Sequence, residues 1–316
     1  MTTDRAPIGI GLTLPTWPLR DGGYASWPQM RRLAQAMEAI GVDTLWVADH
    51  LQRTTPARGT FGFWESWTIL TAAAEATSRV GIGPFIACTG FRNPALLAKM
   101  AETLDEVSGG RVVLGLGSGG PARDPSWSAF GFDGGRHVSR YGEAVEIVTR
   151  LLRDGQLTYH GEHYDVEGAV ILPRGPRAGG VPVLAAGLGE RTMQIAARHA
   201  DQINVNRAIA GATDADEVVG IARTACEAVG RDPATLRVTG WGRVAIDDHG
   251  MAVDKRGCLV GEPAEVAATV RGIRDAGVEH MTIYPGTADD PSPLPALTDE
   301  TLDRFAPFLE AIRAAA

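Results

Sequence analysis

The sequence contains little of several things that mark specialised classes of protein. Its three cysteines, Cys88, Cys226 and Cys258, are far apart and odd in number. They match no zinc-ligand spacing and no convincing disulfide set, so the sequence predicts a reducing, cytoplasmic setting and no metal site. Lysine is also scarce, since Lys99 and Lys255 are the only two. Neither lies at the end of an expected strand, which disfavours Schiff-base chemistry.

Long apolar runs and an excess of basic residues are also missing. No stretch of about 18 apolar residues exists, so no membrane span is expected. The N-terminal residues lack the long apolar stretch of a secretion signal. There are 30 basic and 38 acidic residues, which gives a net charge of −8. An acidic chain without a basic stripe is a poor binder of nucleic acid or anionic membranes, so neither is an expected partner.

What remains is a globular chain of 316 residues with 44 % hydrophobic residues. This length fits two ordinary domains or one α/β barrel with insertions. No linker rich in proline or serine divides the chain, and apolar strands alternate with amphipathic helices along it. Ser26, Pro28 and Gln29 form a capping box at the start of one helix, and Asn93–Pro94 starts another. Strands are expected at 8–14, 44–48, 80–87, 112–116, 181–186, 202–205, 238–246 and 280–284.

Helices are expected to follow these strands, at 30–40, 67–77, 94–107, 138–152, 190–199, 214–229, 263–276 and 298–314. Eight such units predict the α/β class and a single (β/α)8 TIM-type barrel over residues 1–316. Two insertions, at about 121–137 and 155–180, follow the fourth strand. The first is rich in glycine, proline and tryptophan, and the second contains a hairpin near 157–164. We expect both to cover the C-terminal mouth, where barrel active sites lie.

Four segments of the chain resemble a known family. They are LWVADHL at 45–51, NPALLAKMAETLDEVSGGRVVLGLGSG at 93–119, PVLAAGLGERTMQIAARHAD at 182–201 and LVGEPAEVAATVRGIRDAGVEHMTIYP at 259–285. In this order they resemble the bacterial luciferase-like family of flavin-dependent oxidoreductases. The resemblance implies a TIM-type barrel, reduced FMN or the deazaflavin F420 as cofactor, and a homodimer.

His50 is the candidate catalytic residue. It follows the second expected strand, so its side chain should point into the mouth, and histidine exchanges protons near neutral pH. The resemblance implies that it faces the flavin ring as an acid or base. A histidine that pairs with Asp49 is the structural alternative. Asp49 is interpreted as an orienting partner close to the cofactor.

Three further segments are candidates for holding the cofactor. The resemblance implies that Ala87, Cys88 and Thr89 support the ring through a bulge or a non-proline cis peptide, with Cys88 as a packing residue. Gly117 and Ser118 end the fourth strand, where glycine allows close backbone approach. The strongest physical argument concerns the loop after the fifth strand, because two glycines before a helix N-terminus form an anion site. Its residues are Gly187, Leu188, Gly189, Arg191 and Thr192.

Aromatic residues on segments near the mouth favour a flat or apolar substrate. Trp17 and Trp64 are the candidates for the substrate pocket, and Phe61 and Phe63 lie on the same segments. Asn204 and Arg207, near the end of the sixth strand, are candidates for polar contacts. Arg136 and Arg140 depart from the family's usual arginine spacing, so their role stays open.

The function predicted from these residues is oxidation of a small organic substrate by an FMN-dependent monooxygenase that receives reduced flavin from a partner reductase. The alternative is an F420-dependent dehydrogenase or reductase that transfers a hydride. The acidic composition slightly favours FMN, because F420 carries an acidic tail. Two other classes stay open: a flavin-binding protein without activity, and a barrel lyase or isomerase that acts on a phosphorylated metabolite.

Overall fold

A barrel of parallel strands forms the centre of the molecule. The structure is a computed structural model, which describes residues 6–19, 21–56, 58–246, 258–286 and 299–314. Neighbouring strands are parallel and follow the chain order around the ring. The barrel strands are β1 (Gly9–Thr13), β2 (Thr44–Val47), β5 (Gly81–Pro84), β7 (Leu114–Gly117), β10 (Val183–Gly187), β11 (Gln202–Ala208), β12 (Arg237–Ile246) and β14 (His280–Gly286).

The ring closes between β5 and β7. The N–H of Ile82 donates to the Arg111 carbonyl oxygen at 3.0 Å, and the N–H of Val113 donates to the Ile82 carbonyl oxygen at 2.9 Å. The short strand β6 (Ala87–Cys88) continues this edge and pairs with the end of β7. At Gly83 a Cβ atom would lie 1.9 Å from the Val113 carbonyl oxygen. The two backbones approach so closely at this point that only glycine fits.

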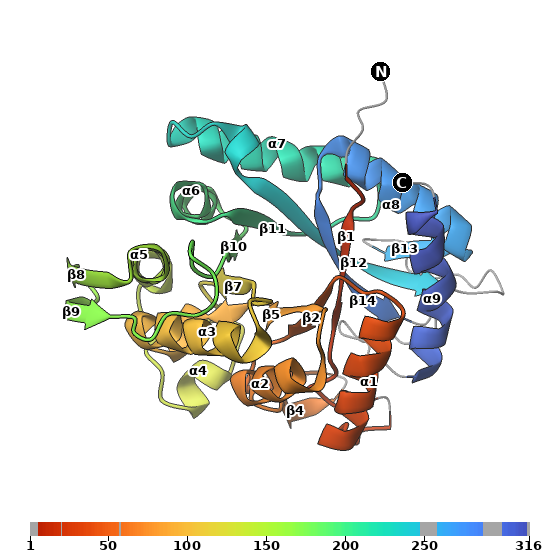
Figure 1. Cartoon of the computed structure of the whole chain (residues 1–316), viewed down its shortest axis with the longest axis horizontal. Coiled ribbons are helices and arrows are strands. Elements are labelled where there is room, and N and C mark those ends of the chain that lie inside the picture. The colour runs from red at the N-terminus through yellow and green to blue at the C-terminus, as the bar shows by residue number, and fades with distance from the viewer. Residues whose placement is uncertain (1–5, 20, 57, 247–257, 287–298, 315–316) are drawn as a thin grey trace.

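The helices cover the outside of the barrel, which confirms the predicted TIM-type fold (Figure 1). The predicted caps are formed, since the Ser26 N–H donates to Gln29 Oε1 at 2.8 Å and Asn93 accepts the N–H groups of Ala95 and Leu96. Among the described helices, none is long and apolar enough to cross a membrane. They are α1 (Trp27–Ala39), α2 (Ser66–Ala76), α3 (Pro94–Ser108), α4 (Ser126–Ala129), α5 (His137–Asp154), α6 (Glu190–His199), α7 (Ala212–Ala228), α8 (Pro263–Ala276) and α9 (Asp299–Arg313), with the 3-10 turns η1 (Thr89–Phe91) and η2 (Pro233–Thr235).

Side chains fill the end of the barrel at which the strands begin. Trp46 and His280 meet edge to face inside the ring, with their ring centroids 5.8 Å apart. Gly11 gives them room, because a Cβ there would lie 2.2 Å from Trp46 Nε1. His280 Nε2 lies 3.1 Å from Thr44 Oγ1, and burial lowers the pKa of His280 to about 4. This end is therefore a packed core, and access to the interior is from the opposite mouth.

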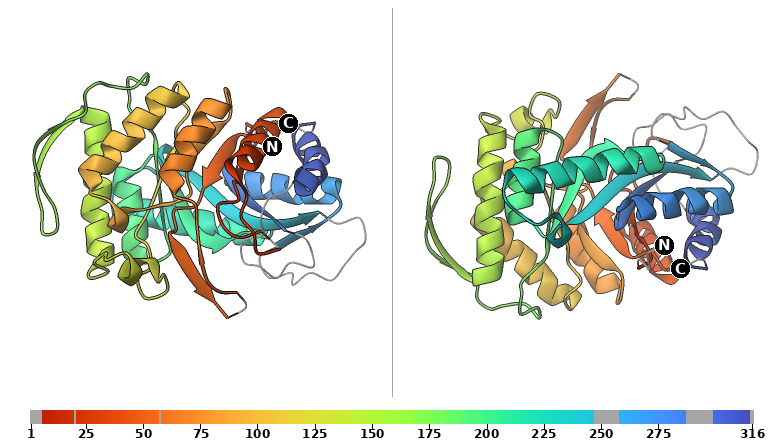
Figure 2. Two further views of the ribbon diagram at one scale, coloured as in Figure 1. Left: turned by 90° about the horizontal axis from the view of Figure 1, so that it is seen from below. Right: turned by 90° about the horizontal axis from the view of Figure 1, so that it is seen from above.

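The first insertion lies at that mouth as predicted. Its helix α4 is tied to the segment after β2, because Ser126 Oγ donates to the Gln52 carbonyl oxygen at 3.0 Å. The second insertion forms the hairpin of β8 (Gln156–His160) and β9 (Asp165–Val170), which runs along the outside of α5 (Figure 2). Glu143 on α5 accepts backbone N–H groups from the hairpin turn. The turn thus reaches the start of α5, near the mouth.

The rest of the second insertion does not cover the mouth, contrary to the prediction. It runs against α3, where Arg174 pairs with Glu102 at 3.1 Å and Arg177 pairs with Asp105 at 2.9 Å. Both carboxylates are buried. Because buried carboxylates require partners, these pairs hold the segment against the side of the barrel.

Three features of the fold were not predicted. The hairpin of β3 (Gln52–Thr55) and β4 (Gly59–Gly62) is partly exposed and lacks an alternating apolar pattern. The strand β13 (Cys258–Gly261) pairs with β12 outside the ring. The expected strand 80–87 is divided into β5 and β6. The non-proline cis peptide that the resemblance implied for this segment is present, between Phe85 and Ile86. Lys255, one of the two lysines considered for Schiff-base chemistry, lies outside the described residues.

Substitution Gly83→Ala tests the closure of the ring. We expect a loss of about 1–3 kcal/mol in the free energy of unfolding, because the new methyl group forces β5 and β7 apart. Urea denaturation of the purified protein measures this. The matched control is Gly220→Ala on α7, where nothing lies within 4 Å of the added Cβ. The control should gain about 0.5–1 kcal/mol from helix propensity. Equal effects of the two substitutions would contradict this account of the seam.

Candidate active site

His50 lies directly after β2 and is held by a carboxylate from the first insertion. Its Nδ1 lies 2.9 Å from Asp124 Oδ2. The imidazole is 34 % exposed, whereas the Asp124 side chain is 13 % exposed. The Phe63 ring lies against the imidazole, with a centroid distance of 5.2 Å. Among the described residues, none bonds the second ring nitrogen, Nε2. The imidazole is therefore fixed at one nitrogen and available at the other.

Asp124 is suited to orient this imidazole. Burial raises the pKa of Asp124, but hydrogen bonds from His50 and Ser126 outweigh it and hold the pKa below its usual value. The carboxylate is thus ionised at neutral pH. An ionised partner favours the proton on Nδ1, which leaves the lone pair on Nε2. His50 can then accept a proton from a bound molecule, or return one.

Asp49 does not pair with His50, the partner that the sequence predicted for it. Its two oxygens accept hydrogen bonds from Ser66 Oγ at 2.6 Å, from the Cys88 N–H at 2.9 Å and from the guanidinium of Arg92 at 2.7 and 3.1 Å. Arg92 also donates to Glu65 at 2.9 Å. Asp49 is buried and does not bond His50, so it neither orients the imidazole nor exposes an oxygen to a ligand. It ties the end of β2 to β6.

The segment from Phe85 to Thr89 forms one side of the mouth. Ala87, Cys88 and Thr89 are buried, and Thr89 Oγ1 donates to the Gly117 carbonyl oxygen at 3.2 Å. Burial raises the pKa of Cys88 to about 12, so its thiol stays protonated and acts in packing, as expected.

The Ile86 side chain lies over the glycines of β7. A Cβ at Gly117 would be 2.3 Å from Ile86 Cδ1, so a larger residue there would displace this side chain. Ser118, the next residue, is half-buried, and its hydroxyl donates to the Gly119 carbonyl oxygen. At this side of the mouth, the Ile86 side chain therefore packs directly against the backbone of Gly117.

The loop between β10 and α6 is the segment for which an anion site was predicted. Gly189 precedes the helix, and nothing lies within 4 Å of the position that its Cβ would take. Leu188 and Arg191 are exposed. Thr192 is buried, and its hydroxyl donates to the Gly189 carbonyl oxygen at 2.7 Å instead of facing a ligand. The free N–H groups and the positive end of the helix dipole remain available to an anion.

A cavity of about 400 Å³ adjoins this helix start. Arg191 lines it from α6, and Arg136 and His137 line it from the start of α5. Glu162, in the hairpin turn, pairs with Arg136 and is the acidic residue in the lining. Arg140, whose role the sequence left open, pairs with Asp133 at 2.6 Å. Cationic side chains thus gather where the helix dipole already favours negative charge.

A group with metal-ligand chemistry lies beside this cavity. Within the described part of the chain, the ligand atoms of Glu143, Glu162 and His163 come within 4.8 Å of one another. Glu143 accepts three backbone N–H groups of the hairpin turn, and His163 Nε2 lies 2.7 Å from Ser139 Oγ. These bonds account for the arrangement as an anchor of the hairpin on α5.

Of the four predicted substrate residues, Trp17 lies at the mouth, whereas the other three have different surroundings. Trp17 is buried at the mouth and packs against Phe63, with ring centroids 6.2 Å apart. Trp64 is 47 % exposed, and its Nε1 donates to the Ala25 carbonyl oxygen. Asn204 is buried inside the barrel, where its Nδ2 donates to Thr239 Oγ1 at 3.0 Å. Arg207 pairs with Glu217 on α7 at 2.9 Å. Only Trp17 belongs to the wall of the mouth.

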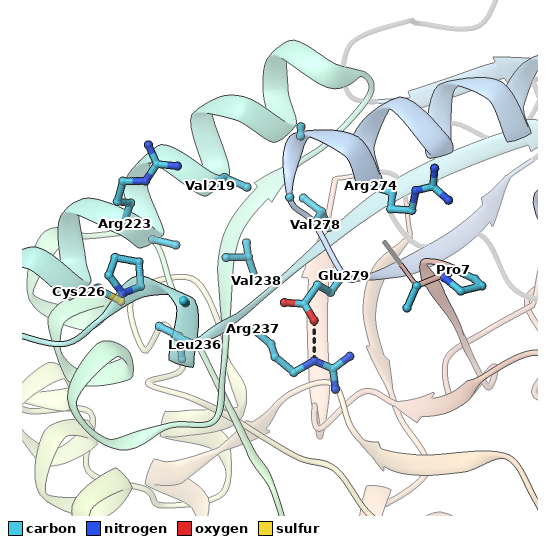
Figure 3. Close-up of a pocket in the computed structure, with 16 residues that line it drawn as sticks. Pro7, Val219, Arg223, Cys226, Leu236, Arg237, Val238, Arg274, Val278 and Glu279 are labelled. Carbon is cyan, nitrogen blue, oxygen red and sulfur yellow. Dashed lines mark hydrogen bonds and ion pairs between the residues drawn. The ribbon is translucent and has the colours of Figure 1, made fainter. Parts of the chain in front are cut away.

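A second cavity of about 440 Å³ lies at the opposite end of the barrel, where β12 and β14 begin. Figure 3 shows Arg223 on α7 and Arg274 on α8 at its two sides, with the ion pair of Arg237 and Glu279 between them. No predicted site residue lines it. Active sites of such barrels lie at the C-terminal face, so this cavity is separate from the candidate site.

Two residues of the site were missed from the sequence. Asp124 lies 74 residues from His50, and Arg92 lies 43 residues from Asp49. Asp124 does carry a local indication of order, because its Oδ1 accepts the Ser126 N–H at the start of α4. That pattern indicates a helix cap and gives no sign of a partner on β2. Only the closing of the barrel brings these segments together.

The fold and the mouth described above define an α/β-barrel enzyme. The luciferase-like monooxygenase family matches residues 10–256, and the chain belongs to this family. Membership confirms the predicted resemblance and the oxidoreductase class.

Similar proteins of known name come from several organisms. The F420-dependent glucose-6-phosphate dehydrogenase of Intrasporangium calvum is 27 % identical over 293 residues, which cover 78 % of this chain and 85 % of that protein. The enzyme of the same name from Kineococcus radiotolerans is 27 % identical over 312 residues, which cover 84 % of this chain and 91 % of that protein. The 5,10-methylenetetrahydromethanopterin reductase of Archaeoglobus fulgidus is 29 % identical over 169 residues, or 54 % of this chain and 46 % of that protein.

Solved structures of low sequence identity share the fold. An F420-dependent secondary alcohol dehydrogenase superposes with a TM-score of 0.77 at 18 % identity and covers 98 % of this chain and 100 % of its own. The EDTA monooxygenase of Chelativorans sp. BNC1 superposes with a TM-score of 0.79 at 16 % identity and covers 98 % of this chain and 94 % of its own.

Substitution Arg92→Met tests the buried pair at the end of β2. The Arg92 side chain is 13 % exposed and that of Asp49 is 1 % exposed. Removing the cation leaves a buried carboxylate without its main partner, so we expect unfolding free energy to fall by about 3–5 kcal/mol in urea denaturation. The control Arg207→Met breaks an exposed pair and should cost less than about 1 kcal/mol. A small loss at Arg92 would show that the pair does not hold the mouth together.

Proposed function

We propose that the protein is an F420-dependent oxidoreductase that transfers a hydride between the deazaflavin and an alcohol or carbonyl carbon. The observation that carries this choice is the cavity at the start of α6, where Arg191, and Arg136 with its partner Glu162, meet a helix N-terminus. F420 carries a phosphate and an acidic tail, and both match this charge. The sequence alone slightly favoured FMN from the bulk charge, and the local charge of the rim favours the other cofactor.

The residues of the mouth fit such a cofactor. The apolar surface of Ile86 over Gly117 is suited to a planar ring, and the bare backbone at Gly189 is suited to a phosphate. Arg136 and Arg191 would hold the acidic tail. The names of the relatives above support the same choice, because two of the three are called F420-dependent dehydrogenases. When bound, the deazaflavin supplies the hydride acceptor or donor.

The chain itself handles the proton. Oxidation of an alcohol carbon releases a proton from the hydroxyl as the hydride leaves, and Nε2 of His50 is placed to accept it. Asp124 holds the imidazole through Nδ1 and stabilises the charge that forms on it. In the reverse direction the same imidazole protonates the carbonyl oxygen. Asp49 acts only by fixing the position of the strand end.

The second candidate is an FMN-dependent monooxygenase, which the family's name favours. It would need reduced flavin from a partner reductase.

A flavin-binding protein without activity does not require the bond between His50 and Asp124, and a lyase on a phosphorylated metabolite does not require a surface for a planar ring. These alternatives therefore leave parts of the mouth unexplained.

We also propose a homodimer in the cytoplasm, joined through α2 and α3. A groove of about 320 Å³ between these helices is lined by Trp67, Met100, Leu104 and Val107, together with the polar residues Thr68, Thr71, Lys99 and Thr103. Leu96 and Val107 are exposed apolar side chains on α3. Exposed apolar surface of this kind is typical of protein–protein contacts.

Titrations with F420 and with FMN, followed by absorbance, test the choice of cofactor. We expect tight binding of F420 and weak binding of FMN, with an F420 affinity that decreases as salt is added. Arg191→Ala should raise the F420 Kd about threefold or more, as expected of an exposed ion pair worth up to about 1 kcal/mol. Arg150→Ala, on the exposed pair with Glu146, should change nothing. Tighter binding of FMN would overturn the proposal in favour of the second candidate.

His50→Ala tests the catalytic assignment. We expect kcat for F420 reduction by an alcohol to fall at least about 100-fold, because general base catalysis contributes about 10²–10⁴. The F420 Kd should stay within about twofold. Asp124→Asn should lower kcat by a smaller factor, and Asp275→Asn on α8 serves as the control. An unchanged kcat in His50→Ala would remove this residue from its assigned role.

A further inference from the structure

A buried serine at the start of α4 is bonded to the backbone just beyond His50. Ser126 is fully buried, and its Oγ donates to the Gln52 carbonyl oxygen and accepts the Gln52 N–H, each at 3.0 Å. One hydroxyl thus satisfies both backbone polar groups of one residue, as a neighbouring strand does in a sheet. Because Gln52 is only two residues from His50, these two bonds fix the first insertion to the segment that carries the imidazole.

The same serine also holds the carboxylate that faces His50. The Ser126 N–H donates to Asp124 Oδ1 at 2.9 Å, and the other oxygen, Oδ2, lies 2.9 Å from His50 Nδ1. Each carboxylate oxygen therefore has its own partner, one on the insertion and one on the imidazole. Ser126 is also among the groups whose hydrogen bonds hold the pKa of Asp124 below its usual value. The carboxylate is thus ionised, and it cannot turn from the imidazole without breaking a bond.

These bonds close a ring that starts and ends at His50. The ring runs from the imidazole to Asp124, from Asp124 to Ser126, from Ser126 to Gln52, and back along the chain to His50. Asp124 lies in a loop, where a side chain that lacks partners can take several rotamers. In the ring, a displacement of one member strains the bonds on both sides of it. The ring therefore restricts the carboxylate to the position beside Nδ1.

Apolar packing places α4 but does not orient the carboxylate. Trp127 is buried, and Leu51 packs against the cluster that contains it. The Trp127 ring also fills the space over Gly90, where a Cβ would lie 2.0 Å from Trp127 Cη2. This packing anchors the helix, but the hydrophobic effect is non-directional. The direction of the carboxylate comes from the hydrogen bonds of Ser126, which depend on angle.

We propose that Ser126 is a positioning residue for proton transfer, which acts through Asp124 to hold the His50 imidazole with Nε2 free to face the substrate oxygen. The proposal rests on the proposed function for the role of His50 as the base. In the oxidation, the carbinol C–H bond breaks and its electron pair leaves as a hydride to the deazaflavin, while the hydroxyl proton moves to Nε2. The carbon and oxygen form the C=O bond of the product. The ionised Asp124 stabilises the imidazolium, so a displaced carboxylate slows this step.

The tautomer of His50 in the cofactor-free protein tests this role without any reaction. Nitrogen NMR of protein labelled with 15N-histidine reports which ring nitrogen carries the proton, and His50→Ala identifies the signals by their loss. The measurement is made at about pH 8, where histidine is ordinarily neutral. We expect the Nδ1–H form to dominate in the native protein. Ser126→Ala should lower the ratio of the Nδ1–H to the Nε2–H form about threefold or more, because the bond to Asp124 weakens.

Two further variants separate positioning from a general loss of structure. Ser126→Thr keeps the hydroxyl and should restore the native tautomer ratio. Ser128→Ala, on the same helix, removes an exposed hydroxyl that lies 3.4 Å from the Pro125 carbonyl oxygen, and it should leave the ratio unchanged. An unchanged ratio in Ser126→Ala would overturn the proposal. An equal change in Ser128→Ala, or in Ser126→Thr, would also overturn it, since the buried hydroxyl would then not be the cause.

The holoenzyme separates this proposal from the proposed function. With F420 bound and cyclohexanol as the probe, Ser126→Ala should lower kcat about tenfold, because the rate is sensitive to small misplacements of a reacting group. The KM for the alcohol and the F420 Kd should stay at their native values, and Ser128→Ala should keep the native kcat. A native kcat in Ser126→Ala would overturn the positioning role and keep the proposed function. If the native protein binds no F420, the proposed function is overturned, and the tautomer ratio still decides the role of Ser126.

Discussion

The buried ion pair between Asp49 and Arg92 is the constraint on which the mouth depends. It joins the end of β2 to the start of α3, and the Cys88 N–H on β6 bonds the same carboxylate. Taking these charges out of water is costly, and they are retained because the hydrogen bonds around them are nearly complete. This ion pair also fixes the position of His50, the residue after Asp49. It fixes the segment around Ile86 as well, on which the proposed planar ring would lie.

The side chain of His50 is thus held from two independent directions. The backbone before His50 is fixed by the strand and by Asp49, whereas the imidazole is fixed by Asp124 from the first insertion. An insertion between two barrel strands therefore does more than cover the mouth, because it delivers the carboxylate that selects the histidine tautomer. The proton transfer proposed for His50 would therefore not require Asp49 to face the ligand.

The two sides of the mouth have opposite chemistry. Cationic side chains and a helix N-terminus lie beside β7 and β10, and aromatic rings lie beside β1, β12 and β14. The two sides of the mouth are therefore suited to ligand groups of different character. The acidic net charge of the whole chain gave no indication of this separation, because net charge averages over surfaces that face different ligands.

The fold and half of the site could be predicted because their causes are local. Apolar periodicity and capping residues placed α6 and α8 at the observed bounds, and strand ends placed His50 and Gly189 at the mouth. The exposed hairpin at β3 and β4 lacks such periodicity and was missed. The partners of Asp49 and His50 and the choice between Trp17 and Trp64 were decided by tertiary structure alone. These depend on which distant segments the closing ring brings within hydrogen-bond distance, and no local pattern records that.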